Sequence, residues 1–160
     1  MLAGVAGGLV GGWVMSQFTR VWDKTLPLSR TNRVTRSSLY SPQEWDSISR
    51  SAEWIAAPFV HRRLSPREKQ MGGAMVHYAV SGAAGALYGT TAHYGPGITK
   101  FRGLPFGTAI WLLGNEIIMP AFGLTKKLSK YSLLMQANAL GEHLVYGFTT
   151  NLVYRGLTSR

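Results

Sequence analysis

Residues 2–22 read LAGVAGGLVGGWVMSQFTRVW, and this stretch decides the fold class. No charged side chain occurs in the first 19 residues, before Arg20. About 20 predominantly apolar residues is the length that an α-helix needs to cross a hydrocarbon core of about 30 Å. A cleaved signal peptide usually begins with a basic region, which Met1 to Gly4 do not provide. We therefore expect residues 2–22 to form an uncleaved membrane-spanning helix.

Small residues follow one face of this helix, because glycines recur every four residues. A second group of glycines lies in the segment after residue 80. Small residues allow two helix backbones to approach closely in a membrane. The helix-packing positions that we predict are Gly4, Gly8, Gly12, Gly82, Gly85 and Gly89. The alternative for the first group is a mobile terminus, because glycine destabilises a water-exposed helix by roughly 1 kcal/mol per residue.

A clear start signal opens the second helix, which we expect over residues 66–94. Ser65 precedes Pro66, and Glu68 stands where it can complete a capping box with Ser65. No Asp, Glu, Lys or Arg occurs from residue 71 to residue 94. The sequence Gly95-Pro96-Gly97 is expected to end this helix.

Two further segments are poor in charge and are expected to span the bilayer. The first covers residues 105–120, and Pro120 must bend or end it. The second covers residues 133–155, in which Glu142 is the only acidic residue and Arg155 marks the water boundary. Together the four segments predict an all-α, polytopic membrane protein that forms one domain over residues 1–160.

The connector over residues 20–65 is basic, and we expect an amphipathic helix within it at about residues 42–60. Trp45, Ile48, Ala52, Ile55 and Phe59 share one face of this helix. Its opposite face bears Asp46, Ser47, Arg50 and Ser51. We predict that the helix lies in the lipid headgroup region, with Trp45, Trp54 and Phe59 as interfacial anchors. The alternative is that its apolar face packs on the bundle or on a partner subunit.

Charge and composition narrow the classes of function. Charged residues make up 15% of the chain, where soluble domains carry about 25%. The net charge of +10 comes from clusters that flank the apolar segments, with no aromatic-interleaved recognition motif, so no nucleic-acid partner is expected. Cysteine is absent, which excludes disulfides, thiolate metal sites and cysteine nucleophiles. A soluble helical bundle is the competing interpretation.

Several polar residues fall inside the expected spans and are the candidate site residues. They are His77, Asn115, Glu116, Glu142 and His143. Ionisable groups inside a membrane usually face the interior of a bundle or a wet cavity, where they carry protons or solutes. The same groups can instead form a structural hydrogen-bonded cluster that fixes helix register. We predict no catalytic residues, no metal site and no cofactor, although isolated histidines leave a haem or a chlorophyll-type pigment open.

Short motifs across most of the chain resemble an uncharacterised bacterial inner-membrane protein family, the one that includes YagU. The motifs are the run Gly7–Phe18, His77-Tyr78, Gly85-Ala86-Leu87-Tyr88-Gly89, Trp111 ahead of Asn115-Glu116 and Pro120, Gly123-Leu124, and His143-Leu144-Val145-Tyr146-Gly147. The resemblance implies a multi-pass protein of the bacterial inner membrane, with a link to acid stress in one member and no agreed activity. Relatives often carry Asp where this chain has Asn115, which puts a paired-carboxylate site there in doubt.

Two functions remain, neither of them enzymatic. The first is an accessory or scaffold subunit, or a small homo-oligomer, which acts through helix packing against the lipid bilayer and other membrane subunits. The second is a protein that handles protons or small solutes through buried Glu and His. The orientation of the termini stays open, because the basic residues favour both termini outside and the resemblance favours both inside.

Overall fold

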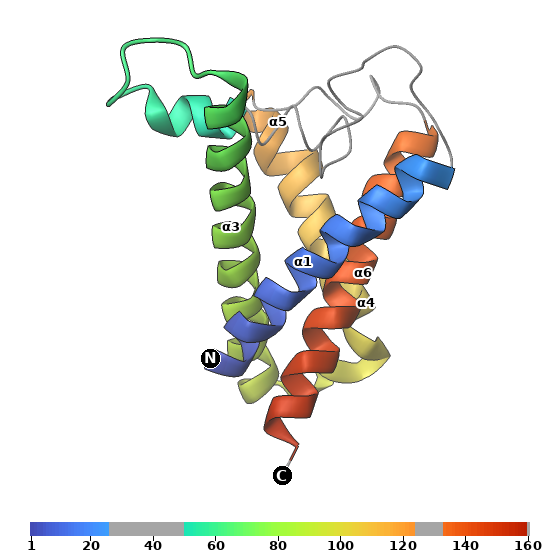
Figure 1. The fold of residues 1–160 in the computed structure, drawn as a ribbon. Coiled ribbons are helices and arrows are strands. Elements are labelled where there is room, and N and C mark those ends of the chain that lie inside the picture. Colours follow the sequence, from blue (N-terminus) through green and yellow to red (C-terminus); the bar gives the residue numbers. More distant parts are fainter. Residues whose placement is uncertain (26–49, 124–132, 160) are drawn as a thin grey trace.

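The computed structural model describes residues 1–25, 50–123 and 133–159, and all regular structure in these ranges is helical (Figure 1). The predicted all-α class is therefore confirmed. The long helices are α1 (Leu2–Thr25), α3 (Pro66–Tyr94) and α6 (Leu133–Thr158). A 3₁₀-helix, η2 (Pro96–Gly103), leads into a continuous run of α4 (Leu104–Ile110), the π-helix η3 (Trp111–Ile118) and α5 (Met119–Ala121). Within these ranges, none of the helices combines the length and the apolar character that a membrane span requires.

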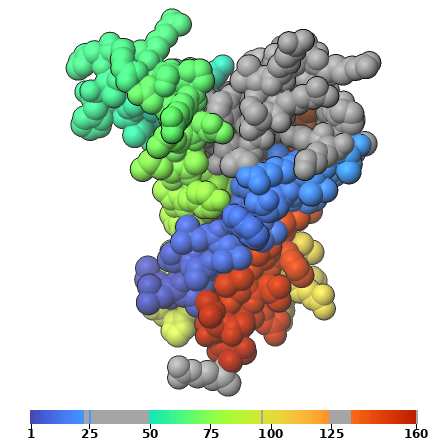
Figure 2. Space-filling model, in the orientation of Figure 1, coloured from blue at the N-terminus to red at the C-terminus, as the bar shows by residue number. Residues whose placement is uncertain are grey.

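Helix α1 joins the other two long helices. It lies across α3 and α6 on one face of the molecule and packs extensively against both (Figures 1 and 2). The run over residues 104–121 packs mainly through α4 against α6. The two termini lie at the same end of the molecule (Figure 1).

The crossing of α1 and α3 depends on the predicted glycines. A Cβ atom at Gly85 would lie 2.6 Å from the Cα of Gly8, and one at Gly4 would lie 2.8 Å from the Cα of Gly89. Backbone would have to move to make room for either side chain. Gly82 is different, because a Cβ there would meet only side chains, those of Leu9 at 3.4 Å and Val5 at 3.9 Å, which are ordinary contact distances. Gly82 is thus buried against α1, but side chains and not backbone face it, so this position tolerates a Cβ better than Gly4 or Gly85 does.

A second glycine crossing joins α4 to α6, and the sequence analysis missed it. A Cβ atom at Gly147 would lie 2.6 Å from the backbone nitrogen of Gly107. Just before α4, Gly103 has a φ of 80°, a left-handed conformation that side chains rarely adopt. Glycine thus allows the chain both to turn into α4 and to pack on α6.

The start of α3 follows the predicted capping box. The Ser65 Oγ accepts a hydrogen bond from the Glu68 backbone N–H at 3.3 Å, and the Glu68 carboxylate accepts one from the Ser65 backbone N–H at 2.8 Å. Arg62 also donates to Glu68, at 2.9 Å. The hydrogen bond from Arg62, followed by those from Ser65, holds the pKa of the Glu68 carboxyl well below its ordinary value. Gly95 ends the helix, as predicted.

The connector helix differs from the prediction at its C-terminal end. Helical structure covers residues 50–56, and residues 57–59 form a turn. Pro58 explains the early end, because a proline disfavours the α conformation of the residue before it. The expected span 42–49, with Trp45, lies outside the described residues.

The faces of this connector helix are also only partly as expected. Ala52 is buried, but so is Ser51, which was assigned to the polar face, so that assignment is wrong. The two described anchor residues are largely exposed, Trp54 by 66% and Phe59 by 82%. The ring of Trp54 contacts that of Phe122, with centroids 6.4 Å apart. Ser51 is buried because residues 50–56 pack against the helical bundle, where Ala52 lies beside Gly72 of α3.

Candidate functional site

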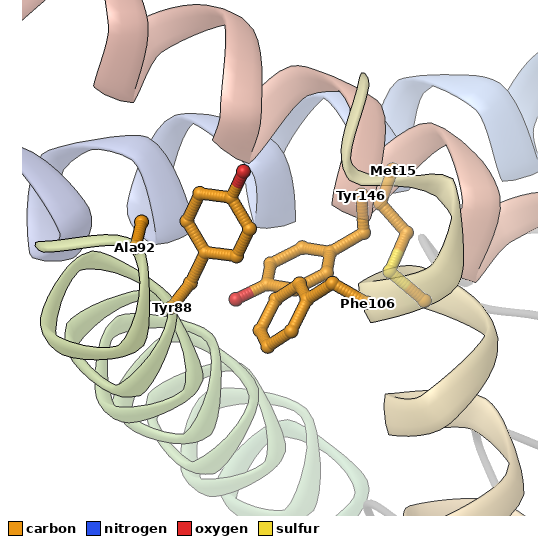
Figure 3. Close-up of a cluster of buried hydrophobic side chains, with 5 residues drawn as sticks. All are labelled: Met15, Tyr88, Ala92, Phe106 and Tyr146. Carbon is orange, nitrogen blue, oxygen red and sulfur yellow. The ribbon is translucent and has the colours of Figure 1, made fainter. Parts of the chain in front are cut away.

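A cluster of aromatic side chains forms the core between α1, α3, α4 and α6 (Figure 3). Its buried members are Met15, Tyr88, Ala92, Phe106 and Tyr146. Both tyrosine hydroxyls are used across helix boundaries: Tyr88 donates to the Asn151 Oδ1 and Tyr146 donates to the Ser81 carbonyl oxygen, each at 2.7 Å. These two hydrogen bonds therefore hold α6 against α3. The sequence analysis did not single them out, because an aromatic residue on a helix looks like ordinary core.

Next to this core lies a cavity of about 100 Å³, which we call the histidine cavity. Residues of α1, α3, α4, η3, α5, α6 and the connector helix line it. Its polar lining residues are Ser51, His77, Ser81, Asn115, His143 and Tyr146. Its apolar lining residues are Met15, Val76, Val80, Ala84, Ile110 and Met119. No Asp, Glu, Lys or Arg of the described chain lines the cavity, so its wall is largely apolar with a few polar points.

The two histidines of the cavity are each held by a backbone carbonyl. The Nδ1 of His143 lies 2.8 Å from the carbonyl oxygen of Ala139, and the Nε2 of His77 lies 3.3 Å from that of Gly12. A carbonyl oxygen can only accept, so the ring nitrogen donates in both cases. In a neutral His143 ring the remaining lone pair is then on Nε2. The hydrogen bond to Ala139, one turn earlier on α6, therefore sets the tautomer of this buried ring.

Asn115 reaches the cavity from a π-helical segment. η3 covers residues 111–118, which carry five-residue spacing in place of the usual four. Such segments are rare in proteins, and those that occur are frequently found at functional sites. The wider turn changes the direction in which the side chains point. The π-helix is thus a local feature that favours a functional role for this wall. No pattern in the sequence predicted it.

A second polar cluster surrounds Glu142, which is completely buried. Thr19 on α1 and Asn138 one turn earlier on α6 both donate to the Glu142 Oε1, each at 2.9 Å. The Thr19 and Asn138 side chains are also buried. This cluster ties α1 to α6 at the level next to His143.

The candidate residues from the sequence therefore divide into three places. His77, Asn115 and His143 line one cavity, as an interior site requires. Glu142 belongs to the neighbouring cluster with Thr19 and Asn138. Glu116 follows Asn115 on η3 but is part of neither, and its Oε1 is buried without a hydrogen-bond partner in the described chain. Sequence reasoning missed Thr19 and Ser81, since a lone hydroxyl in an apolar helix usually bonds only to its own backbone.

A metal ion would need several His, Asp or Glu side chains close together among the described residues. No group of three or more His, Asp or Glu side chains comes together there in the way that a metal ion needs. The two imidazoles of the histidine cavity are accompanied by an amide, hydroxyls and thioethers instead. This set suits hydrogen bonding to a neutral guest.

Comparison with known proteins gives one match. The model of a family described as "Protein of unknown function (DUF1440)" matches residues 22–152. No curated protein and no solved structure matches the chain. The matched range contains α3, the run over residues 104–121, and most of α6, and with them the histidine cavity except for Met15. Because this match covers most of its length, the chain belongs to the DUF1440 family, whose function is unknown.

Proposed function

We propose that this protein is a small polytopic membrane protein, in which α1, the charge-free part of α3 over residues 71–94, the run over residues 104–121, and α6 cross the bilayer. The support is an inverted distribution of polarity. Each of these segments exposes large apolar side chains, among them Leu9, Trp13, Met75, Val80, Leu87, Leu113, Ile117, Phe148 and Leu152. The buried polar residues include Thr19, Ser81, Asn138, Glu142, His143, Thr150 and Asn151. Lipid is the solvent in which this arrangement is favourable.

Hydropathy averaged over a whole helix hides this arrangement. On α6 the polar residues Asn138, Glu142 and Asn151 are buried, whereas Leu134 and Leu152 are exposed. An average counts the inward polar face and the outward apolar face together, so it is moderate for each helix. The side that would meet lipid is more apolar than the average indicates.

Membrane integration is tested by extraction of native membranes. We expect the full chain to stay in the membrane pellet after treatment with alkaline carbonate and to enter the supernatant only with detergent. A peripheral membrane protein with a known release profile serves as the control in the same preparation. Recovery of the chain as a dispersed, helical protein in detergent-free buffer would contradict the proposal. The proposal includes the bacterial inner membrane as the location, which is what the family resemblance implies.

Within that setting, we propose that the protein handles protons or small solutes through its interior. The observation that carries this proposal is the histidine cavity, which two imidazoles and Asn115 line beside the buried Glu142 cluster. Ionisable groups in such interiors typically mark a path for protons or solutes. The competing function, an accessory or scaffold subunit, relies on free small-residue faces. In the structure Gly8 and Gly85 face each other within the chain, so they are not available to a partner.

Proton flux into liposomes that contain the purified protein tests the proposal. In Glu142→Gln the amide oxygen still accepts the hydrogen bonds from Thr19 and Asn138, so the fold is retained while the titratable group is lost. We expect this variant to lose most of its flux, and Glu116→Gln, a matched change outside the cluster, to keep it. Equal flux in wild type and Glu142→Gln, together with co-purification of a stoichiometric partner, would support the accessory-subunit function instead.

A further inference from the structure

The size and walls of the histidine cavity restrict what it can bind. Its volume of about 100 Å³ is well above the roughly 10–15 Å³ that one water needs and below the roughly 150 Å³ cavity that accepts benzene. Val80 on its wall is 52% exposed, so the cavity opens to the surface of the bundle. The part of a guest that fits inside it is about three to five non-hydrogen atoms. Val76, Val80 and Ile110 supply apolar wall for the body of such a guest.

Charge restricts the guest further. The described lining contains no Asp, Glu, Lys or Arg. An ion that entered would lose its hydration without gaining an opposite charge, which is costly in an apolar surrounding. The described part of the wall therefore favours a neutral guest over a charged one.

Hydrogen bonding then gives the polarity of the contact. His143 donates its Nδ1 proton to Ala139, so its Nε2 carries a lone pair and can only accept. The Tyr146 hydroxyl, on the same wall, already donates to the Ser81 carbonyl oxygen. A guest with a hydroxyl group can donate a hydrogen bond to the lone pair of His143 Nε2. A guest that can only accept hydrogen bonds leaves this lone pair without a donor.

From these three restrictions, we infer that the histidine cavity binds a small neutral alcohol whose hydroxyl donates to His143 Nε2 and whose carbon body packs on the apolar wall. This inference rests on the proposed function, the handling of protons or small solutes, and it names the class of solute that the interior site binds. An alcohol is uncharged at physiological pH and small enough for the cavity, and it pairs one donor with an apolar body.

Two ligands of nearly the same shape test the inference. The probe is 2-propanol, which donates a hydrogen bond, and its comparison is acetone, which only accepts. Purified protein with ¹⁵N-labelled histidine is titrated with each, and the ¹⁵N resonances of His143 are followed. We expect a saturable shift of Nε2 with 2-propanol, and binding of acetone at least about tenfold weaker, since an unpaired buried acceptor costs about 1–3 kcal/mol. Isopropylammonium, the charged analogue, is expected to give no saturable shift.

A pair of neighbouring variants controls for alcohol that partitions into detergent. Ala84 lines the cavity, so Ala84→Leu fills it, whereas Ala83 is exposed and Ala83→Leu leaves it open. We expect saturable binding to disappear in Ala84→Leu and to persist in Ala83→Leu. If Ala84→Leu fails to fold, the inference is tested by the difference in affinity between 2-propanol and acetone for the wild-type protein. Equal binding of acetone, or no saturable shift with 2-propanol, overturns the inference.

The outcomes also separate this inference from the proposed function. Saturable binding of 2-propanol without proton flux supports the ligand class and counts against proton handling. Flux that depends on Glu142 without any binding of 2-propanol leaves proton handling in place and overturns the ligand class.

Discussion

Replacing Gly85 with alanine is the sharpest test of the packing between α1 and α3. The added Cβ would lie 2.6 Å from the Cα of Gly8, whereas two carbon atoms pack best at about 3.5–4.0 Å. The obstacle is backbone and not the end of a flexible side chain, so the two helices must separate by roughly 1 Å. Overpacking of this kind costs about 1–3 kcal/mol, and alanine returns at most about 1 kcal/mol through its higher helix propensity. We expect the free energy of unfolding to fall by about 1–2 kcal/mol.

The assay is reversible unfolding in mixed micelles, with helicity followed as the fraction of denaturing detergent increases. Gly156→Ala is the matched control, because a Cβ at Gly156 on α6 would meet no atom within 4 Å. We expect that variant to be as stable as wild type or up to about 1 kcal/mol more stable. If Gly85→Ala and Gly156→Ala unfold at the same detergent fraction, the close approach of α1 to α3 is refuted.

Two further predictions concern polar contacts, and the same unfolding assay measures both. Tyr88→Phe removes the donor to the buried Asn151 side chain and should cost about 1–3 kcal/mol; the exposed Tyr94→Phe should cost almost nothing, and equal losses would contradict the hydrogen bond. Glu68→Gln tests the pH dependence at the start of α3, where the hydrogen bond from Arg62 lowers the folded-state pKa of Glu68 below its ordinary value of 4.5. The stabilisation is therefore present above pH 4.5 and lost as the pH falls toward the folded-state pKa, so wild type should exceed Glu68→Gln at neutral pH by a margin that shrinks on acidification. A margin that stays constant with pH would contradict this account.

Local patterns in the sequence were enough to predict the helices. The capping box at Ser65 and Glu68 is made by residues three apart, and the structure contains both of its hydrogen bonds. Gly95 and Pro120 mark helix ends for reasons that also act within a few residues. Where a prediction failed nearby, a local cause had been overlooked, as with Pro58 ending the connector helix at residue 56.

The candidate site could be predicted only as a set of unplaced polar residues. His77 and His143 lie 66 positions apart, and nothing in their local sequence indicates that one cavity holds both. Glu116 and Glu142 were equally plausible partners of these histidines, yet only Glu142 joins a polar cluster. Ser51 was assigned to the wrong face because the helical pattern gives two faces but does not say which side meets the bundle.

By itself the sequence determined the helical class, the approximate bounds of the long helices and four of the glycine positions at which backbones meet, Gly4, Gly8, Gly85 and Gly89. These properties depend on interactions among residues a few positions apart, so they can be read from spacing. Only the tertiary structure decided that Gly8 meets Gly85, that Glu142 receives Thr19, and that two histidines and Asn115 share a cavity. Those outcomes depend on how the helices cross and on the π-helical turn in η3. Both features depend on contacts between residues far apart in the sequence, so the local spacing of residues does not predict them.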